Sequence, residues 1–241
     1  GMTLTGDTIY YDKANGYGKV LGHIESVDST NQITLYGNKS EMWEHDEHGY
    51  VTDSALLVEW SDSTIYTYMH ADTLFTEHIP YQQMQLIAKD SVLVDSVWIL
   101  PAPDTLWIDT TYLQIQAYYN VRIFREDMQA VCDSAHYNGR DSIATLCGDP
   151  VCWNEDNQVS ADTVRIYIKD GSVDYLHGIG NAIAIKQESS TEYNQLAGKE
   201  MFAYVRDNDV YRVDVQGNAE TVFYPQEEDG SYMGVNRTQS S

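Results

Sequence analysis

The sequence predicts an all-β protein built from stacked, repeated strands and hairpins. Three observations lead to this fold class. Apolar and polar residues alternate with a period of two, clusters of turn-forming residues separate the alternating segments, and one sequence unit recurs along the 241 residues. No segment shows a sustained period of 3.6. The stretch 126–133 is compatible with one turn of helix or with an extended strand, and both interpretations stay open.

The alternation is clearest in Val164–Lys169, where Val164, Ile166 and Ile168 share one face of the predicted strand. In Val210–Val215 the alternation places Tyr211 on the same face as the two following valines. The other predicted strands are Ala55–Trp60, Thr64–Met69 and Asn120–Arg125.

Turn signals lie between these strands. Asp170-Gly171 is the strongest, because this dipeptide favours the two-residue turn that joins antiparallel strands. The further predicted turns are residues 12–16, 37–40, 138–141 and 207–209.

The repeated unit starts with a small residue and a polar one and continues as a strand. Its starts lie about 30 to 37 residues apart, except for one gap of about 61, and they are Gly6, Gly37, Ala71, Cys132, Ala161 and Gly198. The long gap contains a predicted insertion from Pro80 to Thr111. Such units stack because none can bury its apolar face alone. We expect one array over 2–225, or two sub-arrays at 2–79 and 112–225, and a flexible tail at 226–241.

The charge balance is strongly acidic, with 37 Asp and Glu against 14 Lys and Arg and a net charge of -23. Such a chain repels phosphate backbones, so we expect no nucleic-acid partner. We interpret the acidity as a solvated surface, and attraction of divalent cations is the alternative. No run approaches about 18 apolar residues, so no transmembrane helix is expected. The opening Gly1-Met2 looks like a cloning scar, which leaves room for a leader or lipid anchor upstream.

No motif for covalent chemistry is present: the sequence lacks a nucleophile elbow, a phosphate loop, a dinucleotide fingerprint and a zinc-protease motif. We therefore expect no enzymatic activity, cofactor or metal. His45, His48 and Asp53 are compatible with a metal site, but the stretch that holds both histidines is better explained as a polar turn between Trp43 and Val51.

Other polar and sulfur-containing residues have structural explanations. Cys132, Cys147 and Cys152 are compatible with one disulfide, but three buried thiols are the preferred interpretation. His136 and His177 are each expected to be structural. The five tryptophans are expected to pack on strands, and stacking on sugar rings is the alternative for them.

Several segments together resemble the OstA-like family, which includes a periplasmic lipopolysaccharide-transport protein and the N-terminal domain of its outer-membrane partner. The resemblance lies in Asn120–Arg125, Met128–Tyr137, Leu146–Val151, Asn157–Tyr167, Gly178–Ile185 and Gly198–Val205. It covers most of the chain in register and is weakest across the insertion. The strong acidity, the insertion and the length for a single jellyroll depart from the family pattern.

The resemblance implies an elongated, twisted, open β-jellyroll of V-shaped strands with an apolar groove for acyl chains. It further implies binding and transport of lipopolysaccharide or a similar acylated lipid without catalysis, as part of a periplasmic bridge for outer-membrane assembly. Other OstA-like jellyrolls would be partners by edge-strand pairing. The predicted groove residues are Ile24, Leu56, Val58, Val121, Ile123, Val164, Ile166, Ile168, Ile183, Ile185, Val213 and Val215.

Two other functions stay open from the sequence. One is a structural or adhesive envelope β-solenoid that binds protein partners and no lipid. The other is a carbohydrate-binding β-helix, which requires a line of exposed aromatic residues around a pair of carboxylates.

Overall fold

The computed structural model describes residues 2–60, 65–89, 92–94, 97–99, 102–207, 209–227 and 231–240. In these ranges the chain forms strands, turns and short connections without any helix, which confirms the all-β prediction. No helix in the described part is therefore long and apolar enough to cross a membrane. Residues 126–127 form a turn and the strand resumes at Met128, so the extended interpretation of this stretch holds.

The strands follow one another with short connections. They are β1 (Met2–Thr5), β2 (Thr8–Asp12), β3 (Tyr17–Asp28), β4 (Ile33–Trp43), β5 (His48–Trp60), β6 (Tyr66–Ile87), β7 (Val92–Val94), β8 (Val97–Ile99), β9 (Asp104–Arg125), β10 (Met128–Asn138), β11 (Ile143–Cys147), β12 (Val151–Asn154), β13 (Asn157–Ser160), β14 (Thr163–Lys169), β15 (Ser172–Gln187), β16 (Tyr193–Arg206), β17 (Asp209–Gln216), β18 (Ala219–Phe223) and β19 (Asn236–Ser240).

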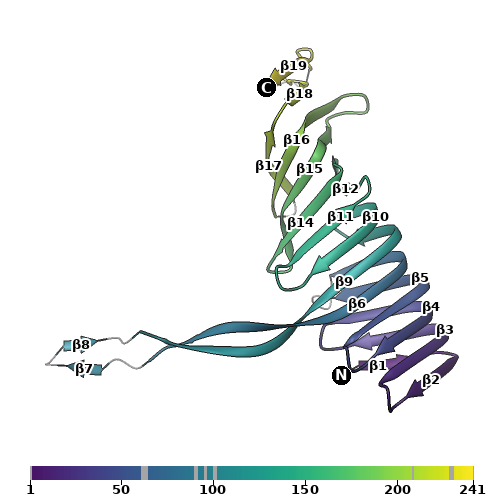
Figure 1. Cartoon of the computed structure of the whole chain (residues 1–241). Coiled ribbons are helices and arrows are strands. Elements are labelled where there is room, and N and C mark those ends of the chain that lie inside the picture. The colour runs from purple at the N-terminus through teal and green to yellow at the C-terminus, as the bar shows by residue number, and fades with distance from the viewer. Residues whose placement is uncertain are drawn as a thin grey trace.

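All of these strands except β7 and β8 belong to one antiparallel sheet that runs the length of the molecule (Figure 1). Each long strand bends near its middle, so the sheet is folded into two facing halves. The first half contains β2, β11, β14 and β17, and the second contains β1, β12, β13, β18 and β19. The remaining body strands cross the bend, and each of them contributes one segment to each half. This is an elongated jellyroll of V-shaped strands.

Two kinds of bend alternate along the stack. The first kind is a small residue followed by a polar one, and its positions are the starts of the predicted repeat units. In the second kind, two consecutive residues have a left-handed φ between 45° and 79°: Gly22-His23, Asp53-Ser54, Tyr119-Asn120, Gly148-Asp149, Gly180-Asn181 and Gly217-Asn218. The repeat that the sequence shows is therefore one bend of each kind, which corresponds to two stacked strands.

The bends are joined to one another by hydrogen bonds. The backbone N–H of Asp162 donates to the carbonyl of Gly180 at 2.8 Å, and Asp7 makes the same contact to Gly22 at 2.9 Å. The side-chain amide of Asn181 donates to the Asp162 carboxylate at 3.1 Å. Small residues are required at the first kind of bend because the inner face is crowded there. A Cβ on Gly37, for example, would lie 2.3 Å from Val51 Cγ1.

The core lies between the two halves. Cross-strand registers line up one row of inner residues in each half, and apolar side chains dominate both rows. The first-half row is Val20, Ser40, Val51, Leu74, Ala117, Ala135, Leu146, Val164, Gly178, Met201 and Val215. The second-half row is Ser26, Leu35, Leu57, Met69, Ile123, Ala130, Cys152, Val159, Ala184, Leu196 and Thr221.

The sequence-predicted turns at 12–16, 138–141, 170–171 and 207–209 lie between strands, although Asn208 lies outside the described residues. The turn predicted at 37–40 is wrong: these residues lie inside β4 at a bend, and their backbone continues the strand. Ser61 to Thr64 also lie outside the described residues, and the strand predicted from Thr64 begins at Tyr66. The predicted flexible tail contains β19, which pairs with β18.

The predicted insertion forms the outer part of a long two-stranded hairpin made by β6 and β9. This hairpin leaves the body and ends at β7 and β8 (Figure 1). The predicted limits, Pro80 and Thr111, are directly paired across the two strands. The sheet is continuous through the inner parts of β6 and β9.

Candidate binding groove

A cavity of about 740 Å³ lies between the two sheet halves. Its deep part is apolar, and the lining there is Ile33, Leu57, Met69, Leu113, Ile115, Ile123, Met128, Ala144, Ile166, Ile168 and Val173. It reaches the surface at Thr30, Arg140 and Asp170, which are exposed. The cavity is therefore a groove with an apolar floor and a polar mouth.

The groove continues toward the C-terminal end of the stack. A second cavity of about 250 Å³ lies there, lined among others by Leu196, Ala203 and Val213. A small space of about 30 Å³ shares Met128 and Val173 with the larger cavity. The small space also shares two lining residues, Val159 and Val210, with the second cavity. The three spaces thus follow one apolar path along the molecule.

Two contacts join the sheet halves across the mouth. Asn31, in the turn after β3, lies 3.3 Å from His78 Nε2 on β6. Arg125, at the end of β9, donates from Nη1 to the carbonyl of Gly171 at 3.0 Å and forms an ion pair with Asp127 at 2.8 Å. Both contacts link the end of a second-half strand segment to the first half.

The mouth carries charges of both signs. Arg125 and Arg140 are its described cations, and Glu59 and Asp170 are its described anions. The Arg140 guanidinium lies 5.0 Å from the centre of the Tyr81 ring. In a chain with a net charge of -23, this balance makes the mouth much less acidic than the rest of the surface.

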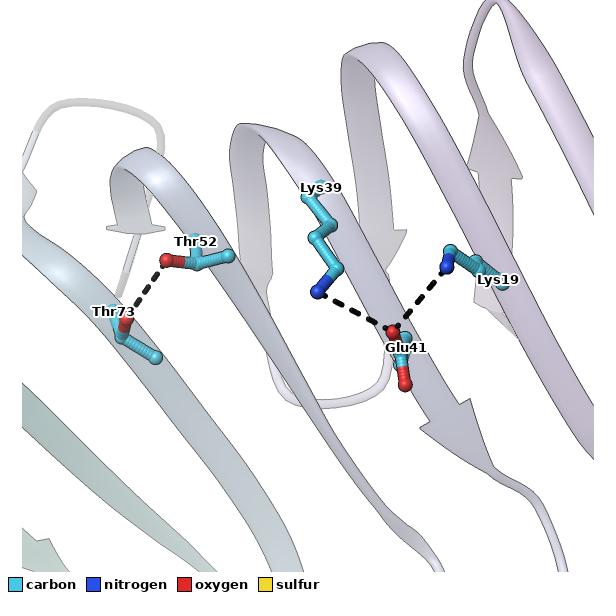
Figure 2. A network of polar contacts seen from close by, with 5 residues as sticks. All are labelled: Lys19, Lys39, Glu41, Thr52 and Thr73. Carbon is cyan, nitrogen blue, oxygen red and sulfur yellow. Dashed lines mark hydrogen bonds and ion pairs between the residues drawn. The ribbon is translucent and has the colours of Figure 1, made fainter.

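Polar networks on the outer face have a different role. Glu41 lies 3.7 Å from Lys19 on the neighbouring strand β3 and 3.5 Å from Lys39 on its own strand β4 (Figure 2). Thr52 on β5 and Thr73 on β6 share a hydrogen bond of 2.8 Å (Figure 2). Desolvation opposes ionisation of the Glu41 carboxyl, but hydrogen bonds from tyrosines and the Lys39 charge outweigh it and lower its pKa. These cross-strand contacts stabilise the sheet from outside.

The structure places eight of the predicted groove residues toward the interior. Ile24, Val121, Ile123, Val164 and Ile166 are buried, and Ile168, Val213 and Val215 pack partly buried against the core. Three of them, Ile123, Ile166 and Ile168, line the large cavity, and Val213 lines the second one. Contact of these residues with a lipid stays a prediction.

Three other predicted residues, Leu56, Val58 and Ile183, lie on the outer face, and the predicted side is wrong for them. Leu56 and Val58 alternate with the buried Leu57, which takes the inner position. Ile183 is 39% exposed and alternates with the buried Ala182. The twelfth predicted residue, Ile185, is half-buried and lines the second cavity at the end of β15. Close to the bends the two halves approach each other, so small side chains take the inner positions.

Charged residues at the mouth of the groove are not among the positions predicted from the sequence. Glu59 and Arg125 fall in predicted strands and Arg140 falls in a predicted turn, yet all three line the mouth. No local pattern marks them, because their position depends on how strands far apart in sequence are stacked.

The candidate histidines and cysteines have structural surroundings. Residues 44–47 form the turn before β5, and His48 stacks on Trp43 with ring centres 4.8 Å apart. His177 stacks on Phe202 and lies 3.0 Å from Glu200. No cluster of metal-binding side chains occurs within the described residues.

All three cysteines are free, and Cys132 and Cys152 are buried whereas Cys147 is half-buried. Desolvation by burial raises the pKa of each of the two buried thiols to about 12. These thiols therefore stay protonated and unreactive at neutral pH. The structure agrees with the interpretation of the cysteines as packed thiols rather than as a disulfide.

The geometry defines a class of protein: an all-β jellyroll, folded along one line of bends, with an apolar groove that opens on the opposite side. No protein-family model matches the chain, and no curated protein matches it. Among solved structures, it is similar to the crystal structure of LptH, the LptA homologous periplasmic component of the conserved lipopolysaccharide transport device from Pseudomonas aeruginosa. The sequence identity is 9% and the TM-score is 0.42, and the match covers 61% of this chain and 82% of that one. The fold class rests on the strand registers, and membership of the OstA-like family stays a prediction.

Proposed function

We propose that this protein binds an acylated lipid of the lipopolysaccharide type in its groove and passes it along the stack without covalent chemistry. The observation that carries this proposal is the row of three neighbouring spaces, which share apolar lining residues along the molecule. A closed, dry core would not need a mouth lined by charged and exposed residues. A path that is apolar inside and polar at its opening suits a molecule with acyl chains and a hydrated headgroup.

The size of the groove is adequate for this ligand. Binding sites for small molecules typically enclose about 300 to 1,000 Å³, and the larger cavity alone holds about 740 Å³. Each methylene group that leaves water contributes about 0.8 kcal/mol. An acyl chain of about ten buried methylenes would thus gain about 8 kcal/mol before the cost of ordering it.

Partners and location form part of the same proposal. The stack ends in strands with one free edge: β1 and β2 pair only with β3, and β19 pairs only with β18 among the described residues. Such edges can accept a strand from a similar jellyroll. We place the protein in the periplasm of a Gram-negative envelope, as a segment of a bridge toward the outer membrane.

Photo-crosslinking tests the proposal. A photoreactive residue at Ile166 faces the large cavity, and one at Val213 faces the second cavity. The matched outer positions are Arg165 and Tyr211, which are exposed on the same strands. Tyr211 does not share the face of Val213 as predicted, because the register of β17 with β16 shifts between Val210 and Arg212 and leaves Tyr211 in a bulge. After irradiation with lipopolysaccharide, we expect lipid adducts from the two inner positions and none from the outer ones.

Two results would contradict lipid transport. Absence of adducts from a folded protein would favour a structural β-solenoid. Adducts from the outer positions alone would mean that the lipid adheres to the surface and that the groove is not its site.

A further inference from the structure

The outer part of the β6–β9 hairpin is here called the arm and comprises the described residues of 80–111. Beyond Tyr81 and Thr111, which border the groove, the arm exposes large apolar side chains. The exposed fractions are 53% for Met84, 58% for Leu86, 46% for Ile87, 46% for Leu106, 60% for Trp107 and 40% for Ile108. A two-stranded hairpin is at best marginally stable in water by itself. Its apolar residues therefore need a partner surface.

The arm also has free edges. Its last backbone bonds to the body are the His78 N–H to Glu47 and the Gly139 N–H to the carbonyl of Leu113, at 3.0 and 2.9 Å. Beyond these residues, β6 and β9 pair only with each other in the described structure. The register is continuous from Leu113 to Trp107, so Trp107 directs its N–H and C=O away from β6, as Leu113 does. The β9 edge can thus accept an antiparallel strand.

We propose that a second copy of this chain pairs with the arm, β9 against β9, around a two-fold axis at Trp107. In this register Trp107 lies opposite the partner's Trp107, and Leu106 lies opposite the partner's Ile108. The two acidic residues of the segment, Asp104 and Asp109, each lie opposite a threonine of the partner. A shift by two residues in either direction places a carboxylate opposite an apolar side chain, so the sequence of 104–111 selects this register.

The pairing also extends the apolar surface across the new seam. Met84 and Trp107 are directly opposite each other on one face of the arm. The two-fold axis places the partner's pair next to them, giving an unbroken row of four apolar side chains. Isologous pairing of this kind closes on itself and stops at a dimer.

The length of the arm keeps the negatively charged bodies of the two copies apart, so the acidity of the chain does not oppose this pairing. Trp107 lies six residues beyond Leu113, about 20 Å at 3.4 Å per residue, so the two bodies stay about 40 Å apart. The Debye length is about 8 Å at physiological ionic strength, so repulsion between the bodies is screened. A membrane is a less suitable partner, because the free backbone edges of the arm would be left unsatisfied in hydrocarbon.

Sedimentation of the full chain tests this pairing. We expect a monomer–dimer equilibrium that Trp107→Lys weakens about tenfold or more, because an edge lysine opposes strand pairing. The matched control is Phe124→Lys, on the same strand and 51% exposed, where β9 has neighbours on both sides. The control should leave the equilibrium unchanged.

Cysteine crosslinking tests the register. In a Cys147→Ser background, Trp107→Cys should give an oxidised dimer, because paired Cα atoms lie about 5.5 Å apart. Thr105→Cys should not, since the two cysteines would lie about 14 Å apart, four residues along the strand. A chain that stays monomeric at high concentration, a dimer that tolerates Trp107→Lys, equal crosslinking at both sites, or arm-dependent binding to lipid vesicles without a dimer would each overturn the proposal.

Discussion

At the scale of single residues, the bends determine the architecture. Gly180 has a φ of 75° and packs against the neighbouring bend, where a Cβ would lie 2.3 Å from a carboxylate oxygen of Asp162. Gly171 has nearly the same φ, 76°, but a Cβ there would have no atom within 4 Å. The two glycines share a backbone conformation and differ in crowding.

This pair gives a prediction about stability. Gly171→Ala should lower the free energy of unfolding by about 1 kcal/mol, the cost of a left-handed backbone. Gly180→Ala should cost about 2 to 3 kcal/mol, because the Asp162 carboxylate must also turn away and give up its hydrogen bonds from Asn181. Chemical denaturation of both variants measures the difference, and equal losses would show that the contact between bends adds little.

The same scale shows what sequence patterns could and could not predict. Asp170-Gly171 was correctly predicted as a two-residue turn because its conformation is local. The inner face of β5 was predicted incorrectly, since Leu56 and Val58 look more apolar than Ala55 and Glu59. Ala55 is inside because the halves converge at the bend, and Glu59 is inside because the groove opens there. Neither reason is visible in the strand itself.

At the scale of strands and hairpins, Arg125 fixes the end of β9 to the turn between β14 and β15. Its side chain is only 12% exposed and that of its ion-pair partner Asp127 only 14%. Loss of the guanidinium would leave a largely buried carboxylate without its cation and would free the turn at Gly171. Isolated exposed charges contribute far less.

We therefore predict that Arg125→Gln lowers the free energy of unfolding by about 2 kcal/mol, within the range for hydrogen bonds to charged groups. Arg165→Gln, on the outer face, should change it by less than about 0.5 kcal/mol. Hydrogen exchange should also increase at residues 169–172 in the first variant only. Unchanged exchange there would mean that Arg125 does not hold the mouth.

At the scale of the whole molecule, the body and the arm are separable. The sequence predicted the arm's limits because the repeat is interrupted there. It could not predict a projecting ribbon, since alternation has the same period in a free hairpin and in a buried strand. The stacking of repeats was predictable, whereas the mouth of the groove was not, because its residues come from five separate turns and strand ends.

Replacing residues 82–109 by Asn-Gly should leave the body folded and keep Tyr81 at the groove, since Tyr81 and Thr110 are already paired and the dipeptide suits a two-residue turn. The shortened chain should keep its thermal unfolding midpoint and the lipid adducts at Ile166, but should sediment as a monomer. A large loss of thermal stability would show that the arm contributes to the body's core.

The alternation of two kinds of bend also constrains how the molecule can change in length. One bend of each kind forms the smallest increment that returns the chain to the same side with the same inward face. Because adjacent strands lie about 4.8 Å apart, each increment adds about 9.6 Å to the stack at constant cross-section. Duplication of one unit of about thirty residues would thus lengthen the groove and leave the rest of the fold unchanged. Duplication of a single strand would instead reverse the direction of all the strands that follow it.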